Sequence, residues 1–587
     1  MSNLFHYLYQ GICYIPYALG MVIILLYSPA LALFPRLTSS SLFFTAIPLL
    51  SIALLNLMGL ILFQLNYYDH FIIISLSGIL FILAVLRQIH YYRHNQSEWI
   101  KEHKYLLILN LGIIFPLIAI SGLGAFITDD ALISWNFWAR LNYANISSGN
   151  YSAGYPQYYP FFLSYCYKFL GNTEYQGPVK VLLVIFPFTL LNCLAFSSKH
   201  IAESWWRYII IAFICIFPGF LSLHFYRFYS VGYADPILAA NIVLSVLFLL
   251  KYIENKNSFF LFISTVSAVA ASLSKQPGFL WALWGFPIVL ITNCMIERKI
   301  KLENIISFCV VIFSVLIWLL GAGKYFTHNT GVLTASMGSA NITFQVMLRA
   351  FWHSVVKYFI LQPTLMFLYV GAYVSLNNRI QKVLFWGYII PSTILWLIFG
   401  AYDVRLGLHN LVLCGLLICI NVENIHHNFL LHLKKVSFFV LSVGVLLFLF
   451  FSIREQNVIH ENVEDHIYPL NASKTIIYRY FSTGGEFIYD NIYLKPQVKL
   501  WIPTFYIIPI FYDNNEIIKP VQDYSCQVVL NQIKQTKPDY LFSSGKFKSP
   551  ASDCLLRLVQ QQPKVFTEIP LGNPHYKYRL FKFNETE

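Results

Sequence analysis

Predominantly apolar runs of roughly 20 residues recur along this chain as far as residue 452. A helix of that length crosses the hydrocarbon core of a bilayer, because each residue adds about 1.5 Å along the helix axis. Charged residues make up only 11% of the sequence, whereas soluble domains average about 25%. A chain so poor in charge cannot cover a surface that faces water. The sequence therefore predicts a polytopic α-helical membrane protein.

Hydropathy predicts about fourteen membrane spans in all. The first apolar run is long enough to span and no positive charge precedes it, so we expect no cleavable signal peptide. The two spans around Lys275 are also compatible with one broken helix pair. The predicted spans lie at residues 13–34, 42–63, 70–88, 105–126, 179–196, 208–225, 233–250, 258–273, 277–296, 304–322, 359–375, 383–400, 406–423 and 436–452.

The short loops between these spans predict an orientation, because Lys and Arg are enriched in cytoplasmic loops. If the loop 87–104 is cytoplasmic, alternation of the spans places the basic segments KYIENK, ERKIK and LKK on the same side. Both chain ends then lie outside. We therefore expect a multi-pass plasma (inner) membrane protein whose active site faces the periplasmic, extracytoplasmic side.

Three domains follow from this pattern. Residues 1–104 carry additional N-terminal spans, and residues 105–452 form a transmembrane core with long outer loops at 127–178 and 323–358. From Ile453 on, 15 Lys and Arg stand against 14 Asp and Glu, so the excess positive charge of this chain (net +13) lies in the membrane part. That distribution argues against a nucleic-acid-binding domain, which would carry a basic face.

Residues 453–587 mix polar and apolar residues and predict a small extracytoplasmic α/β domain. Cys526 and Cys554 each begin a predicted helix of this domain. In an oxidising compartment they could form a disulfide, although the sequence leaves their separation in space open. Strand-like runs occur at Thr475–Tyr480, Val498–Ile502, Tyr540–Phe542 and Lys577–Phe583, and helix-like runs at Ser525–Gln535 and Ala551–Gln560.

The first outer loop opens with two adjacent carboxylates, Asp129 and Asp130, directly after a predicted span. Leu132, Trp135 and Trp138 follow at helical spacing and predict a short interfacial helix. A helix N-terminus favours a carboxylate, so the pair has either a catalytic role or an ordinary capping role.

Further along this loop lies an irregular aromatic segment with Tyr155, Tyr158 and Tyr159. Such a segment either forms a platform for a sugar or lipid carrier or belongs to an interfacial aromatic belt. A second interfacial helix is expected to follow it.

Other ionisable residues gather at the predicted outer ends of spans. They are costly there unless they face a cavity or one another, although Lys and Arg also extend to the interface. Asp403 and Arg405 are also compatible with a local ion pair, and Arg349 with an amphipathic surface helix. The candidates for substrate binding are Asp235, Lys275, Arg349, Asp403 and Arg405.

Carboxylates beside cationic and aromatic residues suit sugar transfer from a lipid phosphate. A carboxylate can accept the proton of an acceptor hydroxyl, while Lys or Arg stabilises the departing phosphate. The sequence contains neither a GxGxxG motif nor a P-loop, in keeping with a donor that is not a nucleotide.

The chain resembles the GT-C superfamily of polyprenyl-phosphate-sugar-dependent membrane glycosyltransferases. It is most similar to bacterial proteins like the protein O-mannosyltransferases and the lipid A aminoarabinose transferases. The resemblance covers residues 105–452. It rests on Asp130–Trp135 with Ala139 and Arg140, on Tyr155–Pro160, on Gly232–Pro236, on Ser274–Gly278, and on Tyr402–Arg405.

The resemblance implies a GT-C-like fold and an inverting transfer of a hexose or pentose to an extracytoplasmic glycan, lipid or protein. Asp130 would be the general base, with Asp129 sharing or replacing it. Members of the superfamily differ in metal dependence, and this chain shows no clear metal cluster, so a divalent metal is possible but not indicated. Two departures stand out: about three additional spans precede the aspartate loop, and Gln276 and Pro277 follow Lys275 where relatives often carry an acidic residue.

Two other functions compete with this interpretation. A lipid-linked sugar flippase would carry ionisable residues at the bilayer midplane and an internal repeat, whereas the charges here lie mainly at predicted outer ends. An oligosaccharide polymerase or ligase would carry a large outer loop rich in Arg and His, whereas loop 323–358 offers one Arg and two His.

Overall fold

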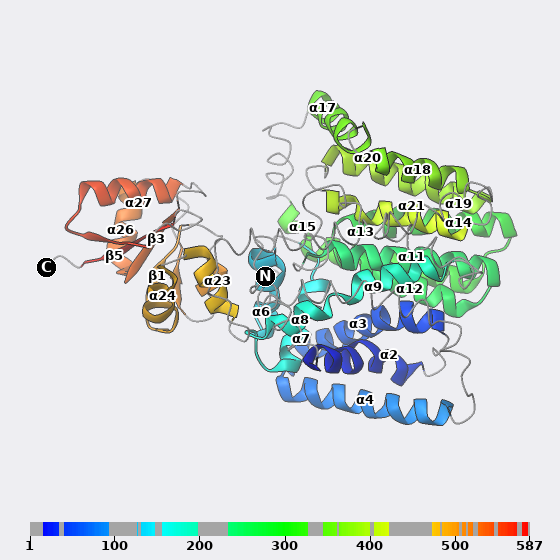
Figure 1. Ribbon diagram of the computed structural model, residues 1–587, viewed down its shortest axis with the longest axis horizontal. Coiled ribbons are helices and arrows are strands. Elements are labelled where there is room, and N and C mark those ends of the chain that lie inside the picture. Colours follow the sequence, from blue (N-terminus) through cyan, green and yellow to red (C-terminus); the bar gives the residue numbers. More distant parts are fainter. Residues whose placement is uncertain are drawn as a thin grey trace, which may run out of the picture.

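The computed structural model describes a body of packed helices and a smaller domain with a β-sheet, which lies beyond one end of that body (Figure 1). Seven helices within the described segments are long and apolar enough to cross a membrane. They are Pro16–Leu33, Thr45–Gln64, His70–His90, Gln176–Leu194, Asp235–Asn255, Pro277–Glu297 and Arg379–Phe399. The described residues are 16–34, 40–92, 126, 131–146, 155–197, 233–326, 344–360, 363–399, 404–421, 472–481, 484–503, 508–511, 515–519, 526–544, 550–571 and 578–584.

The helical body has three layers in Figure 1, joined by contacts of α3 with α12 and of α11 with α21. The lower layer contains η1 (Val22–Tyr27), α2 (Ser28–Leu33), α3 (Ser40–Gln64) and α4 (His70–Tyr92). The middle layer contains α11 (Asp235–Asn255) and α12 (Ser258–Ser272). The upper layer contains α18 (Pro363–Ser375), α19 (Arg379–Leu384), η8 (Phe385–Ile389), α20 (Ile390–Phe399), η9 (Val404–Gly407) and α21 (Leu408–Ile420).

The remaining helices of the body connect and flank these layers. Those of the first outer loop and the span after it are η2 (Ala131–Trp135), α6 (Asn136–Tyr143), α7 (Tyr158–Leu170), α8 (Gln176–Leu182) and α9 (Ile185–Ala195). Those that follow α12 are α13 (Pro277–Leu280), η6 (Trp281–Gly285), α14 (Phe286–Glu297), α15 (Leu302–Phe326), α17 (Phe344–Val355) and η7 (Val356–Ile360).

Every predicted span that falls within the described residues coincides with a helix or a run of consecutive helices. The region around Lys275 is an antiparallel pair, α12 and α13–α14, joined by a tight turn. The span predicted at 179–196 is divided between α8 and α9. The spans predicted at 208–225 and 436–452, and all of 105–126 except Phe126, lie outside the described residues.

Local sequence signals set several helix ends. Pro236 occupies the first turn of α11, where a missing backbone N–H costs nothing. Lys256 ends α11 in the left-handed conformation with φ 54°. The side chain of Asn257 then caps α12 by accepting a hydrogen bond from the backbone N–H of Phe259. Two antiparallel helices therefore follow one another with almost no linker.

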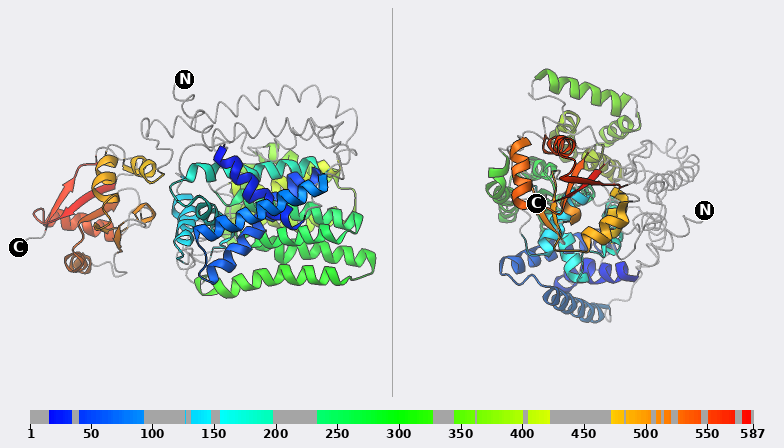
Figure 2. Two further views of the ribbon diagram at one scale, coloured as in Figure 1. Left: turned by 90° about the horizontal axis from the view of Figure 1, so that it is seen from below. Right: turned by 90° about the vertical axis from the view of Figure 1, so that its left-hand side faces the viewer.

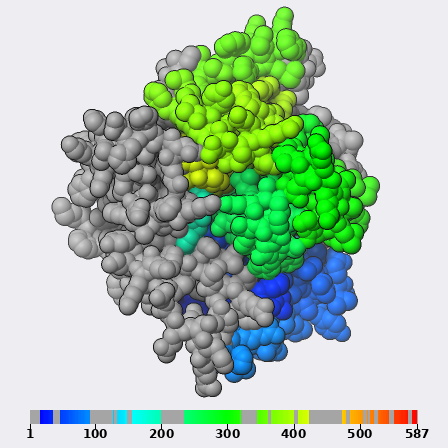
Figure 3. All heavy atoms as spheres, turned by 90° about the vertical axis from the view of Figure 1, so that its right-hand side faces the viewer, coloured from blue at the N-terminus to red at the C-terminus, as the bar shows by residue number. Residues whose placement is uncertain are grey.

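Basic and acidic side chains gather at the end of α11 where this turn lies. The 21 residues of α11 span about 31 Å, so this end is far from Asp235. There Lys256 forms an ion pair with Glu297, and Tyr252 donates a hydrogen bond to Glu303 at 2.7 Å. Figure 3 shows this end of the molecule, opposite the C-terminal domain. Charged side chains are therefore present at both ends of α11.

The C-terminal domain contains one five-stranded sheet with strand order β2-β1-β3-β5-β4. β1 is parallel to β2 and β3, whereas β5 is antiparallel to β3 and β4. The strands are β1 (Lys499–Trp501), β2 (Glu516–Ile518), β3 (Tyr540–Ser544), β4 (Phe566–Ile569) and β5 (Tyr578–Phe583). The helices are α23 (Ala472–Phe481), α24 (Gly485–Ile488), η12 (Tyr489–Tyr493), α25 (Ile508–Phe511), α26 (Cys526–Thr536) and α27 (Pro550–Gln561).

Both faces of this sheet are covered by helices, because side chains alternate along each strand. In β3, Leu541 packs with α26 and α27, whereas its neighbour Phe542 packs with α23 and α25 on the other face. In β5, Phe581 and Leu580 divide in the same way. The predicted α/β composition is therefore present, as three layers.

One predicted strand of this domain is wrong. Thr475–Tyr480 lies within the helix α23, which buries Ile476, Ile477 and Phe481. The spacing from Ile477 to Phe481 is one helical turn, so these residues share one face. The β-branched residues Ile476 and Ile477 favour a strand locally, but packing of the segment against the sheet stabilises a helix instead.

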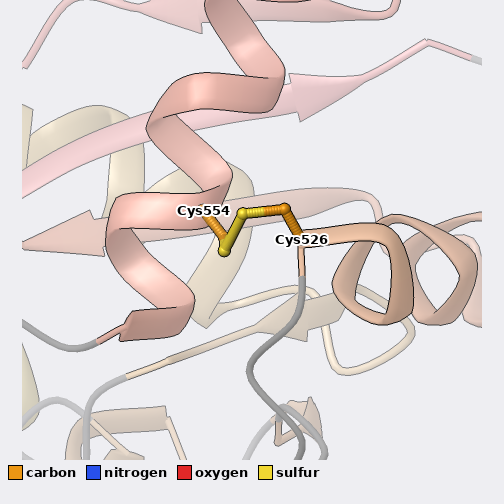
Figure 4. The surroundings of a disulfide bond; sticks show 2 residues. All are labelled: Cys526 and Cys554. Atoms are coloured by element: carbon orange, nitrogen blue, oxygen red, sulfur yellow. A yellow bond between two sulfur atoms is a disulfide. The ribbon is translucent and has the colours of Figure 1, made fainter.

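Cys526 and Cys554 form a disulfide between α26 and α27, with their Cα atoms 5.1 Å apart (Figure 4). The bond joins the first residue of α26 to the middle of α27 on one face of the sheet. It settles a pairing that the sequence left open.

Candidate functional site

The centre of the candidate site is a buried ion pair between two predicted site residues. Lys275 Nζ donates a 2.8 Å hydrogen bond to Oδ1 of Asp235. Asp235 is 2% exposed and Lys275 9%. Asp235 is the first residue of α11, and Lys275 lies in the turn between α12 and α13, so the antiparallel packing of these helices brings the two side chains together. A buried charge pair is stable only when both partners are present.

The turn that carries Lys275 depends on Gly278. A Cβ atom at this position would lie 2.0 Å from the backbone oxygen of Ala271, so no larger residue fits. Pro277 fits beside it because the first turn of α13 needs no N–H donor. The Ser274–Gly278 segment therefore has a local explanation: it folds the chain sharply and fixes Lys275 at the helix end.

A cluster of four aromatic side chains from the first outer loop contacts this pair through Trp135. Lys275 Nζ lies 5.9 Å from the centroid of the Trp135 ring. Trp135 in turn contacts Trp138, Tyr155 and Tyr159, with ring centroids 5.1, 5.9 and 6.0 Å away. The two tryptophans are 4% and 5% exposed. The short helix predicted here is present as η2 and α6, and its two tryptophans pack inside the protein.

The backbone of Tyr158 ties α7 to the ion pair. Its N–H donates a 3.0 Å hydrogen bond to the carbonyl of Leu273, in the turn before Lys275. Its carbonyl accepts a 3.0 Å hydrogen bond from Nδ2 of Asn56 in α3. The aromatic segment is therefore held between the Lys275 turn and the N-terminal helices.

The additional N-terminal helices hold α7 through further buried hydrogen bonds. Tyr68 donates to Ser164 at 3.1 Å, and the hydroxyls of Ser77 and Tyr165 lie 3.3 Å apart. The α3 backbone at Gly59 approaches α7 closely, since a Cβ there would lie 3.0 Å from Phe161. These contacts give the N-terminal helices a structural role, because α3 and α4 pack against α7 and hold the aromatic segment in place.

His409 also belongs to this site, although the sequence analysis did not select it. It is 2% exposed in α21, interacts electrostatically with both Asp235 and Lys275, and has its Nε2 3.2 Å from Oγ of Ser392. An ionisable residue inside an apolar helix is itself a signal of a functional site. That signal is present at His409, which lies six positions after Asp403 in the apolar helix α21.

Two buried polar groups of the aromatic cluster are unpaired. Within the described part of the chain, the indole N–H of Trp138 and the hydroxyl of Tyr159 have no hydrogen-bond partner. Such groups are costly when they are left unsatisfied. Both can donate a hydrogen bond to an oxygen of a bound substrate.

The first outer loop and the start of the helix after it also contain buried cations. Arg140, Lys168 and Lys180 are 3%, 7% and 2% exposed. Lys168 lies over the ring of Tyr143 at 4.8 Å, and burial lowers the pKa of its ammonium, an effect that the charge of Asp69 opposes. Part of the positive charge on this side of the body is thus buried. A buried cation attracts an anionic ligand more strongly than an exposed one, because the dielectric constant is lower inside the protein.

The other predicted site residues are placed as follows. Tyr155 is half-buried, and Tyr158 and Tyr159 are buried. Arg349 is exposed on α17. Asp129, Asp130 and Asp403 lie outside the described residues, as does the side chain of Arg405. No group of three or more His, Cys, Asp or Glu side chains suited to a metal ion occurs within the described segments.

Comparison with known proteins leaves the chain without a family assignment. No protein-family model matches the sequence. A search of curated proteins found no match either. The functional interpretation therefore rests on the residues of the site.

Proposed function

We propose that this protein is a glycosyltransferase that moves a sugar from a polyprenyl-phosphate donor to a hydroxyl of an extracytoplasmic acceptor. The observation that carries the proposal is the buried Lys275–Asp235 pair beneath Trp135. Trp135 lies in η2, whose first residue, Ala131, follows Asp130 in the sequence.

In the proposed reaction, the acceptor oxygen attacks the anomeric carbon of the sugar and the bond from that carbon to the phosphate oxygen breaks. The electron pair of this bond stays on the phosphate. The acceptor proton passes to the carboxylate of Asp130, or to that of Asp129. Attack from the face opposite the phosphate inverts the anomeric configuration.

The cations of the site have the task of stabilising the departing phosphate. The hydrogen bond to Asp235 orients Lys275, so that its remaining N–H donors can reach the phosphate. Arg349 and Arg405 are further candidates for the phosphate, and Asp403 for orienting a cation or an acceptor hydroxyl.

The aromatic cluster has the task of binding the sugar or the first lipid units. Tyr155, Tyr158 and Tyr159 contribute to this region, with Trp138 beside them. Support comes from the unpaired donors on Trp138 and Tyr159, since sugar hydroxyls and phosphate oxygens are suitable acceptors.

The proposal is tested by glycan analysis of a deletion strain. Mass spectrometry of extracytoplasmic glycans should show a loss or a shortened glycan, which wild-type protein restores. Asp130→Asn should accumulate in the membrane to normal levels and fail to restore it. Glu568→Gln, on the surface of the C-terminal domain, serves as a control and should restore it. If both Asp130→Asn and Asp129→Asn restore the glycan, the mechanism is wrong.

A further inference from the structure

One face of the helix α17 packs against the helical body. Phe351 and Val355 in α17 and Phe359 in η7 recur every four residues, and all three pack against the hydrophobic core. The ring centroid of Tyr358 lies 5.1 Å from that of Trp396 in α20. α17 itself lies at the edge of the body, at the top of Figure 1 and of the right-hand view of Figure 2. The opposite side of this helix therefore faces away from the described helices.

An exposed apolar stripe lies beside the packed face. It consists of Phe344, Leu348, Trp352 and Val356, which recur every four residues and therefore share one side of the helix. Trp352 in this stripe is 57% exposed. A contiguous row of large apolar side chains on a surface indicates contact with lipid or with a partner.

A basic stripe lies on the other side of the apolar one. It consists of Arg349, His353 and Lys357, each one position after a residue of the apolar stripe. Successive residues of a helix are about 100° apart, so the order around α17 is packed face, apolar stripe, basic stripe. Arg349 and His353 are exposed, and Lys357 is half-buried, with its Nζ 4.7 Å from the centroid of the Tyr358 ring.

The sequence around α17 contains no carboxylate that could compensate these cations. No Asp or Glu occurs between Glu303 and Asp403. α20 and η7, against which α17 packs, lie wholly within this interval. The charge of the basic stripe is therefore complementary to an anionic partner from outside this part of the chain. The cations of the interval are Lys324, Arg349, Lys357, Arg379 and Lys382.

We propose that α17 is an interfacial helix that binds anionic phospholipid of the surrounding membrane. A helix with an apolar side and a basic side lies in the plane of the headgroups, with its apolar side about 5–10 Å deep at the acyl boundary. The apolar stripe would contact acyl chains, while Arg349 and Lys357 contact lipid phosphates. Charge complementarity favours an anionic over a zwitterionic headgroup.

The lipid carrier of the proposed donor is a second source of the same phosphate chemistry, and Arg349 is also a candidate for the donor phosphate. The place of Arg349 favours membrane phospholipid. Its side chain is exposed on the side of α17 that faces away from the core, whereas the Lys275–Asp235 pair is buried. The two sources are separated by experiment.

The test compares amide hydrogen exchange over residues 344–360 in nanodiscs of two compositions, phosphatidylcholine alone and phosphatidylcholine with phosphatidylglycerol. Full-length wild-type protein is measured beside the Arg349→Gln/Lys357→Gln variant. The matched control, Arg379→Gln/Lys382→Gln, removes two exposed cations of the same interval from α19, at the other end of α18. A further variant, Arg349→Lys/Lys357→Arg, keeps both charges.

We expect phosphatidylglycerol to slow exchange of the wild-type segment on the order of 10-fold, because each Lys or Arg at an anionic surface contributes a factor of roughly five. High salt should reduce this difference. Arg349→Gln/Lys357→Gln should exchange equally in both lipids, whereas the control and the charge-keeping variant should behave like wild type. Each variant is compared with itself in two lipids, so a general loss of helix stability cannot produce this result.

Four results would overturn the inference. The first is equal exchange of the wild-type segment in both lipids, and the second is a phosphatidylglycerol effect that persists in Arg349→Gln/Lys357→Gln. The third is slowing by polyprenyl phosphate but not by phosphatidylglycerol, which would assign the basic stripe to the donor carrier. The fourth is protection only when two copies share a nanodisc, which would assign the apolar stripe to a dimer interface. None of these measurements uses sugar transfer, so the inference is tested separately from the proposed function.

Discussion

Lys275 and Asp235 form a 2.8 Å ion pair although 40 positions separate them in the sequence. Each lies at the end of a different helix, and both helix ends meet beside the first outer loop. The pair joins the two predicted motifs Gly232–Pro236 and Ser274–Gly278. The proposed function depends on this contact more than on any other described here.

Removing one member of this pair should destabilise the protein more than removing both. Lys275→Gln or Asp235→Asn leaves a buried charge without its partner, at a cost of about 3 to 5 kcal/mol. The double variant leaves no such charge and should recover part of that loss. Thermal unfolding of the purified protein in detergent measures this coupling. Sugar transfer should be lost in all three variants, and additive destabilisation would show that the two side chains do not interact.

Gly278→Ala should disrupt the turn that holds Lys275. The new Cβ atom would overlap the Ala271 carbonyl, which belongs to the backbone and cannot rotate away. We expect a marked fall in folded yield on size-exclusion chromatography. Gly78→Ala is the matched control, since a Cβ there meets nothing within 4 Å, and it should be neutral or slightly stabilising. Equal yields from the two variants would contradict the tight turn.

Asn56→Ala should loosen the aromatic segment by removing the hydrogen bond to the Tyr158 carbonyl. The expected cost is about 1 kcal/mol, because a buried hydrogen bond is lost. Transfer should fall along with thermal stability, since α7 carries the tyrosines of the site. Leu57→Ala, at a residue of the same helix that is 56% exposed, is the control. If it behaves like Asn56→Ala, the N-terminal helices contribute only general packing.

His409→Ala should reduce transfer at least tenfold, because it removes a ring that interacts with both members of the ion pair. Ser392→Ala should have a smaller effect, since it removes only the neighbour of the ring nitrogen at 3.2 Å. Glycan analysis in the deletion strain measures both. A His409→Ala protein with normal transfer and lower thermal stability would assign the histidine a packing role.

The disulfide offers a test of sidedness. A bond between Cys526 and Cys554 forms only if the C-terminal domain reaches an oxidising compartment. Denatured protein from cells should therefore bind two more maleimide-polymer groups after reduction than before it. The Cys526→Ser/Cys554→Ser variant should show no such difference. Its free energy of unfolding should be lower by about 3 kcal/mol, which a lower unfolding temperature would reveal. Reduced cysteines in wild-type protein would place the domain in the cytoplasm.

The sequence by itself determined the helices of the body. Long apolar runs with few charges identify segments that avoid water, and each such run within the described residues became helical. Local signals such as Pro236 and Asn257 also fixed helix ends. These features depend on residues close in sequence, so they can be derived without a structure.

Only the tertiary structure decided which residues from distant parts of the chain contact one another. Apolar periodicity shows that a residue is buried but not which partner buries it. The pairing of Lys275 with Asp235, the inclusion of His409, and the burial of Leu132 in the C-terminal domain all join segments far apart in the chain. The strand predicted at Thr475–Tyr480 was wrong for the same reason, because packing against a distant sheet overrode the local preference.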